Sequence, residues 1–119
     1  MREKSIVYEK SKLLALRIVK LYSHLIEEKK EYVISKQLLR SGTSIGANLA
    51  ESICAISAAD FQSKLYIALK ESSETRYWLE LLSGAGYLSQ SEFGSIYHDV
   101  DEIFKMLTAS TKTIRETGR

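Results

Sequence analysis

Residues 42–46, Gly-Thr-Ser-Ile-Gly, form the first pattern in the chain that could do chemistry, because they match G-x-S-x-G, the nucleophile elbow of α/β-hydrolases. That elbow needs a strand before the serine, and an acid and a histidine later in the chain. Here the flanking residues have a helical pattern, and the only histidine after Ser44 is His98, which we expect on the solvent side of a helix. We interpret the match as accidental.

The patterns of other catalytic sites are missing. His24 and His98 with one cysteine, Cys54, are too few ligands for a zinc site of familiar spacing. A carboxylate-bridged di-iron site in a helical bundle needs two Glu-x-x-His pairs, and the sequence has none. It also lacks a glycine-rich phosphate loop. We therefore expect no catalytic residue, no metal and no cofactor, and we predict that the protein is not an enzyme.

Two lines of polar residues are the strongest candidates for a binding site. The first line has spacings of four, four and three residues, so its members share one side of a helix: Arg40, Ser44, Asn48 and Glu51. The second line lies on a later segment and consists of Glu71, Glu74 and Trp78. A solvated face with an incidental charge pattern is the simplest interpretation of such lines.

Two observations favour a more specific interpretation of the first line. Ser44 and Asn48 are poor helix formers, and they adjoin small residues that allow another backbone to come close. We expect Arg40 and Asn48 to be buried or half-buried and paired with a carboxylate, either Glu74 or Glu71, since a buried unpaired arginine is costly. Contact with another subunit and contact with a ligand remain the alternatives.

Aromatic residues with polar tips are numerous for a thin helical core. They are Tyr66, Tyr77, Trp78, Tyr87 and Tyr97. Such residues favour interfaces, although a rim of aromatics at the ends of the bundle explains them equally well.

The polar lines need long helices to carry them, and apolar residues recur at helical spacing in four segments, at about residues 5–29, 32–55, 58–83 and 90–114. The chain has no proline, which agrees with long helices and short connections. The residues expected to face the core are Val7, Leu14, Ile18, Leu21, Leu25, Ile34, Leu38, Ile45, Leu49, Ile53, Phe61, Leu65, Ala68, Leu69, Ser72, Leu79, Leu82, Phe93, Tyr97, Val100, Phe104, Leu107 and Thr111. We predict an all-α, antiparallel, up-down-up-down four-helix bundle formed by one domain, residues 1–119.

Glycines and capping residues refine this prediction. Gly42 and Gly46 lie in the second segment with Ala50 one turn on, and we expect them to allow close approach of another helix; a helix break at residues 40–43 is the alternative. The spacings Ser57 to Asp60 and Ser89 to Glu92 resemble capping boxes, and Gly-Ala-Gly at residues 84–86 is a typical helix end.

Composition bounds the remaining possibilities. The net charge is +2, which is only mildly basic, and no apolar run approaches the roughly 20 residues needed to cross a membrane. The charged first ten residues do not resemble a signal peptide, and we expect Cys54 to be a buried, inert thiol, so we predict a cytoplasmic protein. Candidate contacts to nucleic acid are the basic residues Lys10, Arg17, Lys20, Lys105, Lys112, Arg115 and Arg119.

Two motifs resemble those of a known family. Residues 37–51, QLLRSGTSIGANLAE, are similar to the second-helix signature Q-hydrophobic-x-R-[SA]-x-x-S-[IV]-x-x-N-[IL]-A-E, and residues 68–79, ALKESSETRYWL, to the third-helix pattern A-x-x-E-x-x-E-x-x-Y-W-L. Both belong to the four-helix-bundle family of the bacterial 23S ribosomal RNA intervening-sequence protein. Their order and spacing fit, and the resemblance covers nearly the whole chain.

The resemblance implies a left-handed up-down bundle, a ring-shaped homopentamer and no enzymatic activity. Accessory proteins of diversity-generating retroelements, a related branch, bind RNA and a reverse transcriptase, but they are strongly basic and this chain is not. Two functions follow as hypotheses. The first is an oligomeric module that binds structured RNA or DNA through repeated basic patches, and the second is a scaffold for protein–protein interaction that binds no nucleic acid.

Overall fold

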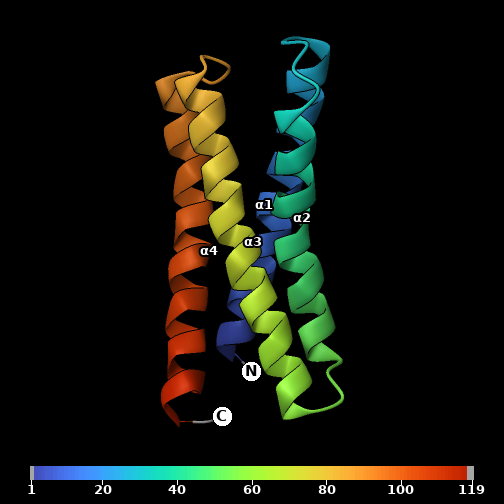
Figure 1. Cartoon of the computed structure of the whole chain (residues 1–119), viewed down its shortest axis with the longest axis vertical. Helices are drawn as coiled ribbons and strands as arrows, with labels where there is room; N and C mark the ends of the chain where they lie inside the picture. The colour runs from blue at the N-terminus through green and yellow to red at the C-terminus, as the bar shows by residue number, and fades with distance from the viewer. Residues whose placement is uncertain (1, 118–119) are drawn as a thin grey trace.

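The computed structural model of the protein describes residues 2–117, and the side chains of residues 6–117. Four helices make up the chain: α1 (Arg2–Glu27), α2 (Ile34–Ile53), α3 (Ala58–Gly84) and α4 (Gln90–Thr117), joined by short connections (Figure 1). Each observed helix end lies within three residues of the predicted one. The all-α fold class is confirmed, and no helix within the described residues is long and apolar enough to cross a membrane.

Successive helices run antiparallel, and α1 and α4 close the bundle. Each helix packs against its two neighbours, and within residues 2–117 no contact joins α1 to α3 or α2 to α4 across the diagonal. The α2–α3 seam is the most extensive and the α1–α4 seam the least. The molecule measures 45 × 22 × 21 Å, with both chain ends at the same end of the bundle (Figure 1). Because α1 and α3 lie at opposite corners, their outer faces point away from each other.

The predicted apolar stripes form the core of the bundle. Leu14, Ile18 and Leu25 of α1 are fully buried, as are Leu38 and Ile45 of α2. On α4 the prediction was partly wrong about which residues are innermost. The buried side chains there are Ile96, Val100, Ile103, Leu107, Thr111 and Ile114, whereas Phe93, Tyr97 and Phe104 are half-buried at the edge of the core. Their aromatic rings are too large for the narrow centre and lie in the seams between helices.

Two predictions at the end of α2 were wrong. Ile53 was expected in the core, but 64% of its surface is exposed. Cys54 was expected to be a buried thiol and is exposed as well. The apolar pattern continues to the last turn of α2, but the helix ends at Ile53, where the chain turns toward α3 and no neighbouring helix covers these residues.

The two glycines of α2 bring α1 close, as expected, and α2 is continuous, so the alternative of a helix break is excluded. A Cβ atom at position 42 would lie 3.0 Å from two side-chain carbons of Ile18, and one at position 46 would lie 3.0 Å from the hydroxyl of Ser11. Only a hydrogen atom fits in these spaces. The contact sets the distance between α1 and α2, and it therefore also sets how far α2 leans toward α3.

The connections are capped largely as predicted. Ser89 and Glu92 form a complete capping box, with Ser89 N–H donating to Glu92 (2.8 Å) and Glu92 N–H donating to the Ser89 hydroxyl (3.1 Å). Ser57 caps α3 by accepting from Asp60 N–H, but the Asp60 carboxylate accepts from Ile56 N–H and not from Ser57. Past the end of α3, Gly86 adopts a φ of +88°, a conformation that favours glycine.

Glu31 is a capping residue that the sequence analysis missed. Its buried carboxylate accepts hydrogen bonds from the backbone N–H groups of Val33, Ile34 and Ser35, at 2.6–3.1 Å, and so caps the start of α2. Burial of the carboxyl raises its pKa, but the hydrogen bonds from the first turn of α2 together outweigh this effect and lower the pKa of Glu31 below its ordinary value. The charged form therefore anchors the α1–α2 connection.

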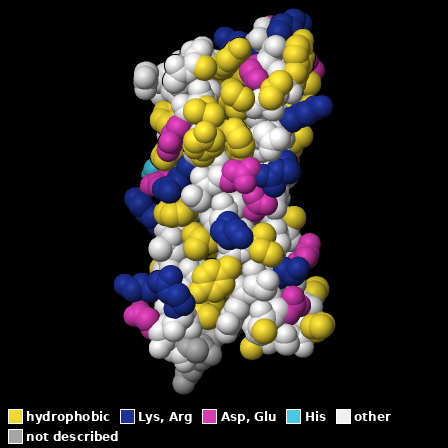
Figure 2. All heavy atoms as spheres, in the orientation of Figure 1, with side chains coloured by type: hydrophobic (Ala, Val, Ile, Leu, Met, Phe, Trp, Pro, Cys, Tyr) yellow, Lys and Arg dark blue, Asp and Glu magenta, His cyan; other side chains and the backbone are white. Residues whose placement is uncertain are grey.

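Large apolar side chains remain on the surface of the bundle. On α1 they are Ile6, Leu13, Leu16 and Val19, exposed by 44–64%, and on α3 they are Tyr77 (52%) and Leu81 (37%). The others lie at the ends of α2 and in its connections: Tyr32, Val33, Ile53 and Ile56. Figure 2 shows apolar atoms gathered over the face that α2 and α3 form. On α4, within residues 90–117, no large apolar residue is exposed.

We predict that Gly42→Ala destabilises the fold by about 1–3 kcal/mol, because overpacking against Ile18 outweighs the gain in helix propensity. Gly94→Ala is the matched control, since its new Cβ meets no atom within 4 Å, and it should stabilise α4 by roughly 0.5–1 kcal/mol. Urea unfolding followed by circular dichroism measures both. In an Ile18→Ala background the cost of Gly42→Ala should shrink, and equal stability of the two alanine variants would contradict the close-approach argument.

Candidate interaction site between α2 and α3

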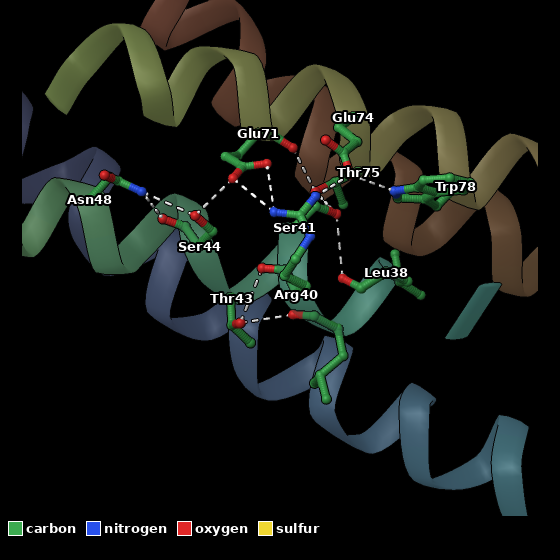
Figure 3. A network of polar contacts seen from close by, with 11 residues as sticks. Leu38, Arg40, Ser41, Thr43, Ser44, Asn48, Glu71, Glu74, Thr75 and Trp78 are labelled. Atoms are coloured by element: carbon green, nitrogen blue, oxygen red, sulfur yellow. Dashed lines mark hydrogen bonds and ion pairs between the residues drawn. The ribbon is translucent and has the colours of Figure 1, made fainter. Parts of the chain in front are cut away.

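Arg40 links α2 to α3 by binding two carboxylates (Figure 3). One terminal nitrogen of its guanidinium lies 3.0 Å from Oε2 of Glu71, and the other contacts Oε2 of Glu74. The two glutamates are three residues apart on α3, so they share the side of the helix that faces α2. The same oxygen of Glu74 accepts from the indole N–H of Trp78 at 2.9 Å.

Ser44 and Asn48 continue this network along α2. The Ser44 hydroxyl donates to Oε2 of Glu71 at 3.1 Å, and the Asn48 amide donates to the hydroxyl and the backbone carbonyl of Ser44 at 3.0 and 2.9 Å. Figure 3 shows these residues in one row along the seam. We define Arg40, Ser44, Asn48, Glu71, Glu74 and Trp78 as the α2–α3 network.

Both glutamates of the network face a single guanidinium. The hydrogen bond from Trp78 is the largest influence on Glu74; partial burial of the carboxyl opposes it, but the net effect, with the contribution of Arg40, lowers the pKa of this carboxyl. The hydrogen bonds to Glu74 and Glu71 in turn raise the pKa of Arg40. At neutral pH one positive charge therefore lies between two negative ones, and the network carries a net charge of about −1.

The predicted pairing of Arg40 with Glu71 and Glu74 is present, but other details of that prediction were wrong. Arg40 is exposed, with 50% of its side chain accessible, because its long side chain extends over the outside of the seam. Asn48 is half-buried as expected, yet it binds Ser44 and no carboxylate. Glu51, the last residue of the predicted line, pairs with Lys64 at 3.0 Å.

A second polar contact between the same helices lies beneath the network. Ser41 and Thr75 are both fully buried, and their hydroxyls share a hydrogen bond of 2.9 Å, while Thr75 also donates to the carbonyl of Glu71 at 2.8 Å. The sequence analysis missed this pair. Its only signal was the presence of hydroxyl residues where the helical period places core positions.

The network borders an apolar patch on α3. The rings of Tyr77 and Trp78 meet edge to face with centroids 5.0 Å apart, and Leu81 follows one turn later. We call Tyr77, Trp78 and Leu81 the α3 patch. The other tyrosines are half-buried: the Tyr97 hydroxyl donates to Glu80 (2.7 Å), and the Tyr66 hydroxyl donates to the carbonyl of Thr111 (3.4 Å). Of the aromatics singled out in the sequence, only Tyr77 is thus placed to meet a partner.

Comparison with known proteins agrees with this architecture. A family model described as "23S rRNA-intervening sequence protein" matches residues 3–109. The chain belongs to this family. A crystal structure of a protein of unknown function from the S23 ribosomal protein family of Bacteroides thetaiotaomicron is similar to it, with 52% sequence identity and a TM-score of 0.90 over 92% of this chain and 98% of that one. No curated protein matches the sequence.

As in the rest of this member of the intervening-sequence family, the arrangement around Ser44 is that of a helix. The G-x-S-x-G residues lie inside α2, and the Ser44 hydroxyl contacts a carboxylate and an amide, not an imidazole. His98 is exposed on α4, as expected. Among the described residues no group of three or more His, Cys, Asp or Glu side chains is placed to hold a metal ion.

The basic residues predicted to contact nucleic acid fall into two groups. Three of them pair with acids of the same chain: Lys10 with Glu102 (3.2 Å), Arg17 with Asp99, and Lys105 with Asp101 (3.0 Å). Lys20, Lys112 and Arg115 are exposed, and within residues 6–117 none of these three forms an ion pair. Arg119 lies outside the described residues.

The three exposed cations do not form one patch. Arg17 of α1 contacts Ser95 of α4, so the level of Lys20 lies near the start of α4. Lys112 is 17 residues farther along α4 than Ser95, which corresponds to about 25 Å at 1.5 Å per residue. Lys20 and the pair Lys112–Arg115 therefore lie toward opposite ends of the bundle.

We predict that Arg40→Ala lowers the free energy of unfolding by about 1 kcal/mol at neutral pH. Its own half-exposed ion pairs are worth little, but the substitution leaves the carboxylates of Glu71 and Glu74 next to each other without a cation. Lys36→Ala, one turn earlier on α2, is the control, because Lys36 is exposed and forms no ion pair within residues 6–117.

Adding Glu71→Gln to Arg40→Ala removes the repulsion and should restore part of the lost stability. Thermal unfolding of the four proteins provides the comparison. If Arg40→Ala melts like the wild type, the network is only a solvated surface.

Proposed function

We propose that this protein acts without catalysis, as a homo-oligomeric binding module. The observation that carries the proposal is the exposed apolar surface of α1 and α3. Leu13 and Leu16 on α1 and Tyr77 on α3 are each more than half exposed, and they belong to continuous stripes. Contiguous apolar patches of this kind on a folded domain are typical of protein–protein interfaces.

The form of oligomer proposed is a closed ring of five copies, which the resemblance to the intervening-sequence family suggests. The ring would serve as a platform for a protein partner through surfaces that remain free after assembly. We also propose a cytoplasmic location, supported by the exposed free thiol of Cys54, which a reducing compartment would preserve.

Light scattering coupled to size-exclusion chromatography tests the oligomer. We expect about 67 kDa, five copies of the 13.5 kDa chain, at micromolar protein and moderate salt. Leu13→Asp with Leu16→Asp should shift the protein to a smaller mass, because two charges in the exposed stripe oppose association. Lys112→Asp on α4 is the control and should keep the full mass. A wild-type protein that elutes as a monomer at all concentrations would refute the proposal.

Nucleic acid is a second candidate ligand, favoured by Lys112 and Arg115. These two exposed cations are three residues apart on α4, so they form one basic spot that an oligomer would repeat. The net charge of +2 per chain makes the overall attraction modest, and affinity would depend on this repetition.

Fluorescence anisotropy with a structured RNA hairpin and a DNA duplex tests this candidate. We expect binding at about 50 mM salt that falls steeply by about 200 mM, since phosphate contacts release counterions. The variant Lys112→Glu with Arg115→Glu should lose most of this binding. Lys29→Glu with Lys30→Glu, at the other end of the bundle, makes the same change in charge and should retain it. No binding of either nucleic acid at low salt would leave the protein scaffold as the function.

A further inference from the structure

We propose that copies of this chain associate head to tail, with the outer face of α1 in one copy lying along the α3 patch of the next. This inference rests on the proposed homo-oligomer and assigns the two surfaces that form it. We define Ile6, Leu13, Leu16 and Val19 as the α1 stripe.

The positions of the two apolar surfaces favour a head-to-tail contact. The α1 stripe and the α3 patch lie on helices that do not touch within the chain, at opposite corners of the bundle. A symmetric pair would use one surface twice and leave the other exposed to water. A contact between two different surfaces covers both, and repeated contacts of this kind generate a ring when the rotation closes.

The charges next to these surfaces are complementary. Lys20 follows Leu16 by one helical turn, is exposed and forms no ion pair within residues 6–117. On α3, Glu74 precedes Tyr77 by three residues and, with Glu71, shares the one guanidinium of Arg40. The α3 surface thus has about one negative charge in excess beside its apolar patch, and the α1 surface has a free cation beside its stripe.

The spacing of the two surfaces also matches. Leu13, Leu16 and Lys20 span seven residues of α1, and Glu74, Tyr77 and Leu81 span seven residues of α3, about 10.5 Å in each case. If Lys20 meets Glu74, then Leu16 lies beside Tyr77 and Leu13 beside Leu81. This register requires α1 of one copy to run antiparallel to α3 of its neighbour.

The contact also explains why the α2–α3 network leaves Arg40 and Glu74 accessible. Arg40 exposes 50% of its side chain and Glu74 exposes 35%. A lysine from a neighbouring copy can therefore reach Glu74 without displacing Arg40, which continues to bind Glu71. The network would then hold the carboxylate in position for the incoming charge, as preorganised groups at interfaces do.

Two variants, each with one surface disabled, provide the test. Leu13→Asp with Leu16→Asp disables the α1 stripe, and Tyr77→Asp with Leu81→Asp disables the α3 patch. Leu13, Leu16 and Tyr77 are more than half exposed and Leu81 is 37% exposed, so both proteins should fold, which circular dichroism checks. Each variant alone should be a monomer by light scattering. An equimolar mixture should form a one-to-one dimer, because each variant contributes the surface that the other lacks.

The outcomes separate this inference from the proposed function. A monomeric wild type refutes the homo-oligomer itself. An oligomeric wild type refutes only the head-to-tail pairing if the mixture stays monomeric, or if either variant alone retains the wild-type mass, as symmetric pairing through one surface would produce.

A charge substitution tests the register. Adding Lys20→Glu to the variant with an intact α1 stripe should weaken the mixed dimer about tenfold, because it places a third carboxylate beside Glu71 and Glu74. Adding Lys36→Glu, on the outer side of α2, should leave the affinity within about twofold. Equal affinities for the two would overturn the proposed contact between Lys20 and Glu74.

Discussion

The close contact of α1 and α2 at Gly42 and Gly46 is the constraint on which the rest of the structure depends. Without side chains at these positions, α2 lies directly against Ile18 and Ser11. The opposite side of α2 carries Ser41 and Ser44, which bind Thr75 and Glu71 of α3. Helix α2 is therefore held between a tight apolar contact and a set of hydrogen bonds. Shifting it toward one neighbour would weaken its contact with the other.

Much of this arrangement could be predicted from the sequence, because the helical period reports directly on burial. The four segments, their caps and the stripes of α1 and α2 follow from spacing alone. The period predicts less well where size matters. On α4 it does not decide between Phe104 and Ile103, and the compact Ile103 is the one in the core, whereas the ring of Phe104 lies in the seam, 3.6 Å from the guanidinium carbon of Arg76. It also fails where a helix ends, as at Ile53 and Cys54, because burial there depends on what covers the end.

The candidate site was predictable in its members and less so in its geometry. The line of Arg40, Ser44 and Asn48 is a matter of helical spacing, and the carboxylates that bind Arg40 could be named because they recur on one side of α3. The exposure of Arg40 could not be, since a long side chain can either enter a seam or extend over it. The role of Glu31 depends on the conformation of a six-residue connection, for which residue spacing carries little information.

The distribution of apolar residues connects the fold to its function. In a bundle of this width each helix has one inward face, and a helix that needed only to fold would have a polar outer face, as α4 does. Helices α1 and α3 instead carry a second apolar face, and the two point away from each other. Leu13, Leu16 and Tyr77 contribute little to the core, so their burial must come from outside the chain. Because those faces are different and lie at opposite corners, any association that covers both is directional. The same α2–α3 seam that holds the bundle together then also presents Glu74 at the edge of the contact.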